Sequence, residues 1–108
     1  MESNAIHLIP VGAAQVYHFS QGDNGRQIRC NLYNGMLAVK LTGSETLKLY
    51  CQTPDKQLVI VDVANTSSTY VDITIPNTLT AVAGKVYCKL HIDGISAKAF
   101  YLDVEGRP

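Results

Sequence analysis

Histidine, cysteine and carboxylate side chains are the groups in this sequence that could carry out catalysis or bind a metal ion. The three histidines, His7, His18 and His91, lie far apart, and none has a cysteine or carboxylate neighbour at the spacing of a metal site. P-loop, dinucleotide-binding, nucleophile-elbow and zinc-protease motifs are missing from the sequence. The sequence therefore predicts a protein that is not an enzyme, with no catalytic residue, no metal site and no cofactor.

Three aspartates, Asp62, Asp72 and Asp103, alternate with apolar neighbours, as solvent-facing residues of a β-strand do. A glycosidase instead holds two carboxylates about 5–9.5 Å apart across a cleft. Because the aspartates follow the strand pattern, we expect them to be solvated surface groups and not a catalytic pair.

The three cysteines, Cys30, Cys51 and Cys88, each belong to a run in which alternate residues are apolar. Their number is odd and they form no C-x-x-C pair. This pattern predicts buried thiols that pack as small hydrophobic side chains. A disulfide from Cys30 to Cys88 between two sheets is the alternative, and synthesis in the cytosol argues against it.

Five tyrosines are out of phase with the leucine, isoleucine and valine residues of their own segments. They are Tyr33, Tyr50, Tyr70, Tyr87 and Tyr101. Tyrosines on an outer sheet face can simply cover the neighbouring strands while their hydroxyls stay in water. Tyrosine is also enriched at protein interfaces, so these five residues are the candidate contact face.

The composition is that of one folded domain with neither a nucleic-acid nor a membrane partner. Of the 108 residues, 46% are hydrophobic and 17% are charged, which is ordinary for a globular chain. Nine Lys and Arg balance nine Asp and Glu, so no excess cation is present to neutralise nucleic-acid phosphates. No run approaches the ~20 apolar residues of a membrane span, and the N-terminus lacks the features of a secretory signal.

Two-residue alternation of apolar and polar residues predicts strands along most of the chain. The predicted strands are 15–19, 27–33, 37–40, 46–51, 58–63, 69–75, 85–92 and 97–104. Short strands separated by turn residues indicate an all-β sandwich or barrel. One helical turn is expected near residues 77–83, with Asn77 as its cap and Gly84 at its end.

The last two predicted strands are expected to form a hairpin. Cys88 and Phe100 both belong to the inward-facing sets of their strands, and both have even numbers. A loop with an odd number of residues, centred on Gly94, keeps both sets on the same face. That register places Tyr87 across from Tyr101.

The order of short landmarks along the chain is similar to that of a known family. The landmarks are 22–26, 41–43, 54–56, 71–76, 83–85 and 95–104. Over residues 15–105 the chain resembles the N-terminal domain of the bacteriophage baseplate upper protein family. It departs from the family pattern at Lys56, where glycine is more usual, and at its start through residues 10–12.

The resemblance implies an immunoglobulin-like antiparallel β-sandwich of about 7–8 strands. Residues 1–14 are then an N-terminal arm, 15–105 the sandwich, and 106–108 the start of a linker or the end of the chain. The implied function is non-enzymatic: a virion protein, made in the bacterial host cytoplasm, that anchors a fibre or receptor-binding assembly to the baseplate or particle. Its partners are other virion proteins, and it forms a homotrimer if the chain continues beyond residue 108.

Two other functions fit the same residues. The first is a small glycan-binding or adhesion module that uses the outer tyrosines, although the sequence contains no tryptophan to stack on sugars. The second is a standalone capsid decoration (head fibre) protein.

Overall fold

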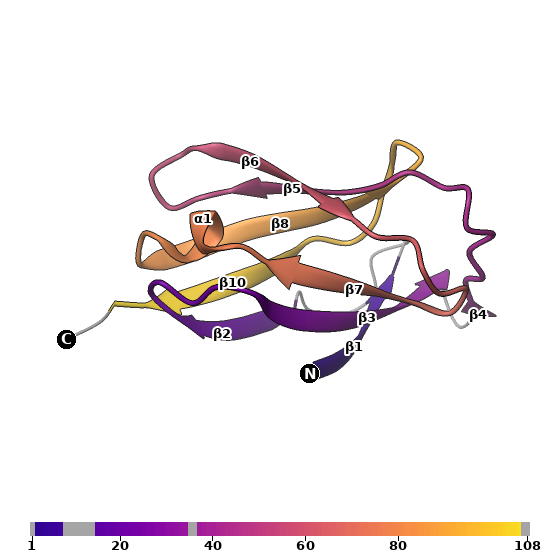
Figure 1. Ribbon diagram of the computed structural model, residues 1–108, viewed down its shortest axis with the longest axis horizontal. Helices are drawn as coiled ribbons and strands as arrows, with labels where there is room; N and C mark the ends of the chain where they lie inside the picture. The colour runs from indigo at the N-terminus through magenta and orange to yellow at the C-terminus, as the bar shows by residue number, and fades with distance from the viewer. Residues whose placement is uncertain (1, 8–14, 35–36, 107–108) are drawn as a thin grey trace.

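Two β-sheets pack face to face in the computed structural model of the chain (Figure 1). The structure describes residues 2–7, 15–34 and 37–106. Within these ranges the elements are β1 (Glu2–His7), β2 (Val16–Ser20), β3 (Arg26–Asn34), β4 (Leu37–Ala38), β5 (Leu47–Gln52), β6 (Leu58–Val63), β7 (Tyr70–Ile75), α1 (Asn77–Thr80), β8 (Gly84–Ile92), β9 (Ile95–Ser96) and β10 (Phe100–Glu105). Each of the eight predicted strands overlaps one of these, and the predicted all-β sandwich is confirmed.

The smaller sheet has the order β1-β3-β4, with β7 also paired to β3. The larger sheet has the order β2-β10-β8-β5-β6, with β9 paired to β8. Figure 1 shows the larger sheet with β6 at one edge and β2 at the other. This arrangement leaves one face of each sheet to the solvent and buries the other.

Two strand pairs are parallel, β1 with β3 and β10 with β2. The expected sandwich was purely antiparallel. The two parallel pairs were not predicted, because apolar residues alternate with the same period in parallel and antiparallel strands. Residues 2–7 of the predicted N-terminal arm form β1 and lie in the smaller sheet. Residues 8–14 of that arm, including the 10–12 segment, and residues 107–108 lie outside the described residues.

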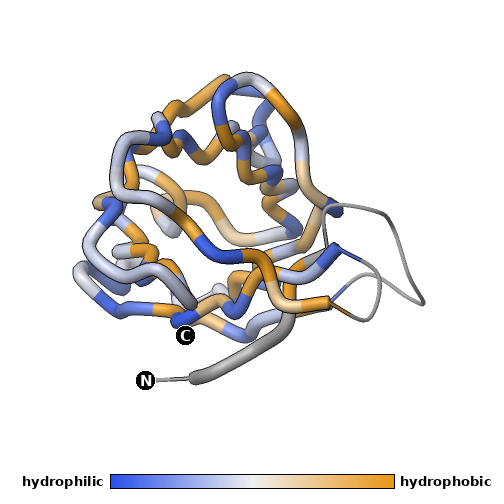
Figure 2. Tube along the Cα trace, turned by 90° about the vertical axis from the view of Figure 1, so that its right-hand side faces the viewer, coloured by the Kyte–Doolittle hydropathy of each residue, from blue (hydrophilic) through white to orange (hydrophobic). Residues whose placement is uncertain are grey.

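The core lies between the sheets and consists of the inward-facing residues of both. Hydrophobic and hydrophilic positions alternate along the strands (Figure 2). In β3, for example, Ile28, Cys30 and Leu32 are buried, while the residues between them are partly exposed. Phe100 and Tyr17 meet edge to face in this core, with ring centroids 5.5 Å apart. Such packing accounts for most of the stability expected of a domain of this size.

The predicted pairing of Tyr87 with Tyr101 is confirmed, but the loop that produces it is different. Asp93 and Gly94 form a two-residue turn between β8 and β9, and both have positive φ, 50° and 83°. The Ala97 N–H still donates to the Leu90 carbonyl oxygen in the register of β9 with β8. Between Ala97 and the start of β10 the register against β8 shifts by one residue. The expected odd loop at Gly94 is therefore wrong, because the extra residue lies further along the chain, as in a β-bulge.

The predicted helical turn is present as α1, but its capping differs from the prediction. Pro76 occupies the N-cap position and Asn77 is the first helical residue. The Asn77 backbone N–H donates to the side-chain oxygen of Asn24, 3.2 Å away, so a distant loop supplies the cap. Gly84 does not end the helix, since Ala81 is the C-cap and Gly84 begins β8.

Gly84 is a position where a side chain is expected to be costly. Its φ is +131°, and an added Cβ would lie 2.9 Å from the Cβ of Pro54. We expect Gly84→Ala to lower the free energy of unfolding by about 1–3 kcal/mol, measured by urea denaturation. The control is Gly43→Ala, where φ is +95° but an added Cβ meets open space. Equal losses in the two variants would contradict a role for the Pro54 contact.

Candidate functional site

The five tyrosines of the candidate contact face divide between the two sheets. Tyr50, Tyr87 and Tyr101 lie on β5, β8 and β10, on the outer face of the larger sheet. Tyr33 and Tyr70 lie on β3 and β7 of the smaller sheet. All five are partly or fully exposed, and each has at least one buried neighbour in its own strand. The structure thus groups three of the five residues on one face.

Tyr87 and Tyr101 form the centre of this group. They lie directly opposite each other on β8 and β10, and their rings meet edge to face with centroids 5.6 Å apart. The Lys85 ammonium lies 5.2 Å from the centre of the Tyr101 ring. Aromatic rings held against a neighbouring ring and a cation lose little conformational entropy when a partner binds them.

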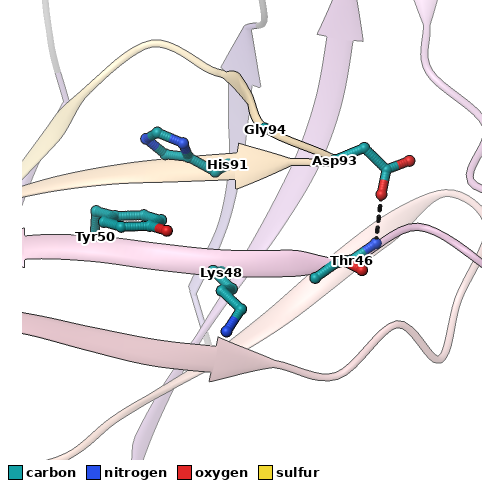
Figure 3. Close-up of a pocket in the computed structure, with 6 residues that line it drawn as sticks. All are labelled: Thr46, Lys48, Tyr50, His91, Asp93 and Gly94. Atoms are coloured by element: carbon teal, nitrogen blue, oxygen red, sulfur yellow. Dashed lines mark hydrogen bonds between the residues drawn. The ribbon is translucent and has the colours of Figure 1, made fainter.

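Tyr50 borders a hollow at the β8–β9 end of the same face (Figure 3). Its ring centroid lies 4.3 Å from that of His91 on β8. The hollow has a volume of about 390 Å³ and is also lined by Thr46, Lys48, Asp93 and Gly94. The Asp93 carboxylate accepts a hydrogen bond of 2.7 Å from the Thr46 backbone N–H, which fixes the rim (Figure 3).

A second hollow joins Tyr50 to Tyr87 across the middle of the sheet. It is almost entirely apolar, has a volume of about 270 Å³, and includes Leu58 of β6 and Lys89 of β8 in its lining. The two hollows share Tyr50 and His91, so they form one continuous surface. We refer to this surface, with Tyr50, Tyr87 and Tyr101 as its aromatic residues, as the tyrosine face.

Exposed aliphatic residues flank the tyrosine face at both edges of the sheet. The strand register places Val16, Tyr101, Tyr87 and Leu58 in one row across the sheet. Val16 is 44% exposed and Leu58 is 68% exposed, and Ile60 beside it is 48% exposed. These aliphatic residues were not predicted from the sequence. The available signal was the run of four apolar residues at 58–61, which breaks the alternation of its strand.

The tyrosine of β7 has a structural role on the smaller sheet. The Arg29 guanidinium lies 3.9 Å from the centre of the Tyr70 ring and donates two hydrogen bonds, of 2.9 and 3.1 Å, to the Asp72 carboxylate. This bidentate contact lowers the pKa of the Asp72 carboxyl group. Tyr70 therefore covers an ion pair between β3 and β7, as expected for a residue that shields its neighbours.

All three cysteines are buried and have free thiols, in agreement with the predicted packing role. Burial raises the pKa of the Cys30 thiol to about 12. The pKa of Cys88 is also raised, first by the hydrogen bond with Cys51, which lies opposite it on β5, and then by burial. The raised pKa values keep the Cys30 and Cys88 thiols protonated, so these two thiols are poor nucleophiles.

The remaining candidate groups lie apart from one another. Asp62 is paired with Lys48, with 3.5 Å between Nζ and Oδ1, and its side chain is 86% exposed. Asp103 lies 3.5 Å from Nδ1 of His18 at the exposed β2–β10 edge. Over residues 2–7, 15–34 and 37–106, no three histidine, cysteine, aspartate or glutamate side chains are grouped so that they could hold a metal ion. No helix in these ranges is long and apolar enough to cross a membrane.

Comparison with solved structures identifies the same fold elsewhere. The N-terminal domain of phage TP901-1 ORF48 superposes with a TM-score of 0.73, over 97% of this chain and 99% of that chain. The chain shares its fold with this phage domain. The two sequences are 12% identical. No family model matches the chain, and no curated protein sequence matches it.

The likeness to the ORF48 domain extends over almost the entire length of both chains, so it concerns the complete sandwich and not one motif. At 12% identity, few side chains are shared between the two proteins. A fold can host several functions, and a binding surface has to be argued from its own residues. For this chain the candidate residues are those of the tyrosine face.

The Glu45 carboxylate holds together the loop before β5 through the hydrogen bonds that it accepts. Its pKa is lowered to about 2, first by the Thr42 backbone N–H and then by the side-chain amide of Asn65. The ionised carboxylate therefore stabilises the fold above pH 4.5, and this contribution disappears as the pH falls from about 4.5 to about 2. We expect Glu45→Gln to lower the thermal unfolding midpoint near neutral pH and to have little effect near pH 2. The control is Glu105→Gln, at the exposed end of β10. A midpoint difference for Glu45→Gln that does not change with pH would contradict this role.

Proposed function

We propose that this chain is the attachment domain of a phage virion structural protein and that it docks on another virion protein through the tyrosine face. The fold shared with a phage protein domain over nearly its whole length supports a role in the particle. The grouping of Tyr50, Tyr87 and Tyr101 on one outer face supports docking there. The proposed role requires a rigid scaffold and a contact face, and no bound cofactor.

The physical character of the tyrosine face fits a protein partner. Aromatic residues are enriched in the cores of protein interfaces, whose rims are polar and solvent-accessible. Here Tyr87 and Tyr101 are central, while Lys48, Lys85 and Lys89 surround them. A partner that covers this face would bury the aromatic rings and leave the lysine ammonium groups near water or near its own carboxylates.

The proposed role places the protein in the virion after synthesis in the bacterial host cytoplasm. Its partner is a protein of the baseplate or of another part of the particle, and the domain anchors a fibre or receptor-binding assembly there. If the natural chain continues beyond residue 108, the following segment carries that assembly and forms a homotrimer.

The decisive test is the protein content of purified particles. Particles of the phage that carries this reading frame are purified and digested, and their peptides are identified by mass spectrometry. We expect peptides of this chain in stoichiometric amounts relative to a major virion protein. Their absence from particles, together with their presence in the infected cell, would contradict the proposal.

A glycan-binding module is a second candidate, favoured by the hollow beside Tyr50. The Tyr50 ring, the His91 ring and the Asp93 carboxylate surround an open space of about 390 Å³, which could hold a sugar ring. A glycan array would test this candidate. A failure of every sugar to bind at millimolar concentration would exclude it. A capsid decoration (head fibre) protein is distinguished from a baseplate protein by electron microscopy of labelled particles.

A further inference from the structure

Strand β6 is an exposed edge strand with an unusually apolar sequence. It pairs with β5 on one side, and on its other side no strand of the described residues pairs with it (Figure 1). Its first four residues, 58–61, are Leu-Val-Ile-Val. Leu58 and Ile60 are 68% and 48% exposed, whereas Val59 and Val61 pack against the core. Edge strands are normally protected by charges, prolines or bulges, and this stretch contains none of these.

The backbone of β6 offers hydrogen-bonding groups along its open side. The Thr53 N–H donates to the Gln57 carbonyl oxygen, so the hydrogen-bonded pairs between β5 and β6 involve the odd-numbered residues of β6. The Asp93 N–H donates to the Thr46 carbonyl oxygen, so the even-numbered residues of β5 form their backbone hydrogen bonds with β8. The odd-numbered residues of β5 then face β6, in agreement with this assignment. The N–H and C=O groups of Leu58, Ile60 and Asp62 therefore point away from β5. They form a template for one more strand.

The edges at β2 and β7 do not combine these features. At the opposite edge of the same sheet, His18 and Ser20 of β2 are exposed and polar. On β7, the outward positions Asp72 and Thr74 interact with side chains of β3. An added strand would bury polar or already partnered groups at these edges, and apolar groups at β6.

We propose that β6 pairs with β6 of a second copy of this chain, antiparallel and about a two-fold axis at Val59. In this register Leu58 lies opposite Ile60 of the second copy, and Ile60 lies opposite Leu58. The two larger sheets then form one continuous sheet, and the exposed Leu58 and Ile60 side chains cover each other. A two-fold contact closes after two copies, so it gives a dimer and not a fibre.

Charge complementarity supports this register and a second copy as the occupant. Asp62 in one copy lies next to the turn of the other copy that carries Lys56, two residues before β6, once at each end of the paired strands. The Asp62 side chain is 86% exposed, and Lys48 approaches one of its oxygens at 3.5 Å, so the other side is open to a second cation. Moving the two-fold axis from Val59 to Ile60 shifts the register by two residues. It would place Leu58 opposite Asp62 and lose both the apolar pairs and the ion pairs. The net charge of zero adds no long-range repulsion between copies.

Lys56 belongs to the turn that leads into β6, where its backbone N–H donates to the Thr53 carbonyl oxygen. Its φ is 69°, in the left-handed region where glycine is favoured, at the end of the turn that leads into β6. A lysine in this conformation carries a backbone cost that glycine would avoid. The proposed ion pair with Asp62 of the second copy accounts for a charged side chain at this position.

The first test measures the oligomeric state by sedimentation velocity, from about 1 µM to about 1 mM protein. We expect the wild type to shift from monomer to dimer over this range. Ile60→Lys should weaken association at least about tenfold, because it places a charge against Leu58. The matched control is Val16→Lys, at the other edge of the same sheet, which should leave association unchanged. A wild type that stays monomeric throughout, or equal effects of the two variants, would overturn the proposal.

Charge variants test the register without changing the apolar contact. Lys56→Glu and Asp62→Lys should each weaken association about fivefold, and the double variant should restore it. Lys56→Gly should also weaken association, while the monomer is at least as stable as the wild type in thermal unfolding. Failure of the double variant to restore association would overturn the register, and with it the choice of a second copy. None of these outcomes depends on the proposed attachment role, because the sedimentation experiment contains the purified domain and no virion partner.

Discussion

Replacing Phe100 with alanine is expected to lower the free energy of unfolding by about 3–5 kcal/mol. Phe100 is 1% exposed and begins β10, the strand that joins β2 to β8 in the larger sheet. Its ring meets the Tyr17 ring edge to face, with centroids 5.5 Å apart and an angle of 85° between the planes. The substitution removes this contact and leaves a cavity that the surrounding strands cannot fill completely. Urea denaturation, followed by circular dichroism, measures the loss.

The neighbouring residue on the same strand provides the control. Tyr101 faces outward and meets Tyr87 across the sheet surface. We expect Tyr101→Ala to cost no more than about 1 kcal/mol, the range of an exposed cross-strand pair. The two variants remove aromatic rings of nearly the same size one residue apart. Similar losses of stability would show that the inward and outward sides of β10 are assigned incorrectly.

Much of the fold was predictable because the strands follow a strict inside–outside alternation. Residues such as Ile28, Cys30 and Leu32 can satisfy burial only if they share one face of a strand. The two-residue period therefore predicts the strands, the core and the outward direction of Tyr87 and Tyr101. It also predicts that these two tyrosines face each other, since the inward residues of β8 and β10 have to remain in register.

Strand direction and pairing partner were harder to predict from the sequence. The period is the same for parallel and antiparallel neighbours, so the parallel pairing of β1 with β3 leaves no sign in the alternation. The register shift between β9 and β10 is likewise hidden, because one extra residue fits equally well in the turn or beyond it. The capping of α1 by Asn24 depends on a residue far away in the chain, and local capping rules do not include such contacts.

The sequence indicated that the candidate face contains tyrosines, but not which tyrosines and which other residues share one sheet. Nothing in the phase of the tyrosines shows that Tyr50 shares a sheet with Tyr87 and Tyr101 while Tyr33 and Tyr70 do not, because that division depends on sheet order. The aliphatic part of the surface was missed for a related reason. An unbroken apolar run suggests burial on both faces, and only the position of β6 at the sheet edge leaves Leu58 and Ile60 exposed.

Under the proposed attachment role, replacing Tyr87 with alanine is expected to weaken docking on the virion partner by about 30-fold, corresponding to ~2 kcal/mol of binding free energy. Tyr87 lies at the centre of the tyrosine face, between Tyr101 and the hollow that contains Tyr50. Central aromatic side chains contribute most to binding because the surrounding contacts exclude water from them. The measurement is cosedimentation of the purified domain with particles that were assembled without this protein.

Tyr33→Ala is the matched control, because it removes the same side chain from the other sheet. It should bind these particles as the wild type does, provided that thermal unfolding shows both variants to be folded under the conditions of the assay. Equal weakening by the two substitutions would mean that docking does not use the tyrosine face. Weakening by Tyr33→Ala alone would place the contact on the smaller sheet, and a Tyr87→Ala variant that binds normally would remove the physical basis for the proposed site. Ile60 lies on β6, outside the central aromatic group. Measuring the binding of the Ile60→Lys variant to the particles therefore distinguishes docking through the tyrosine face from association of two copies through β6.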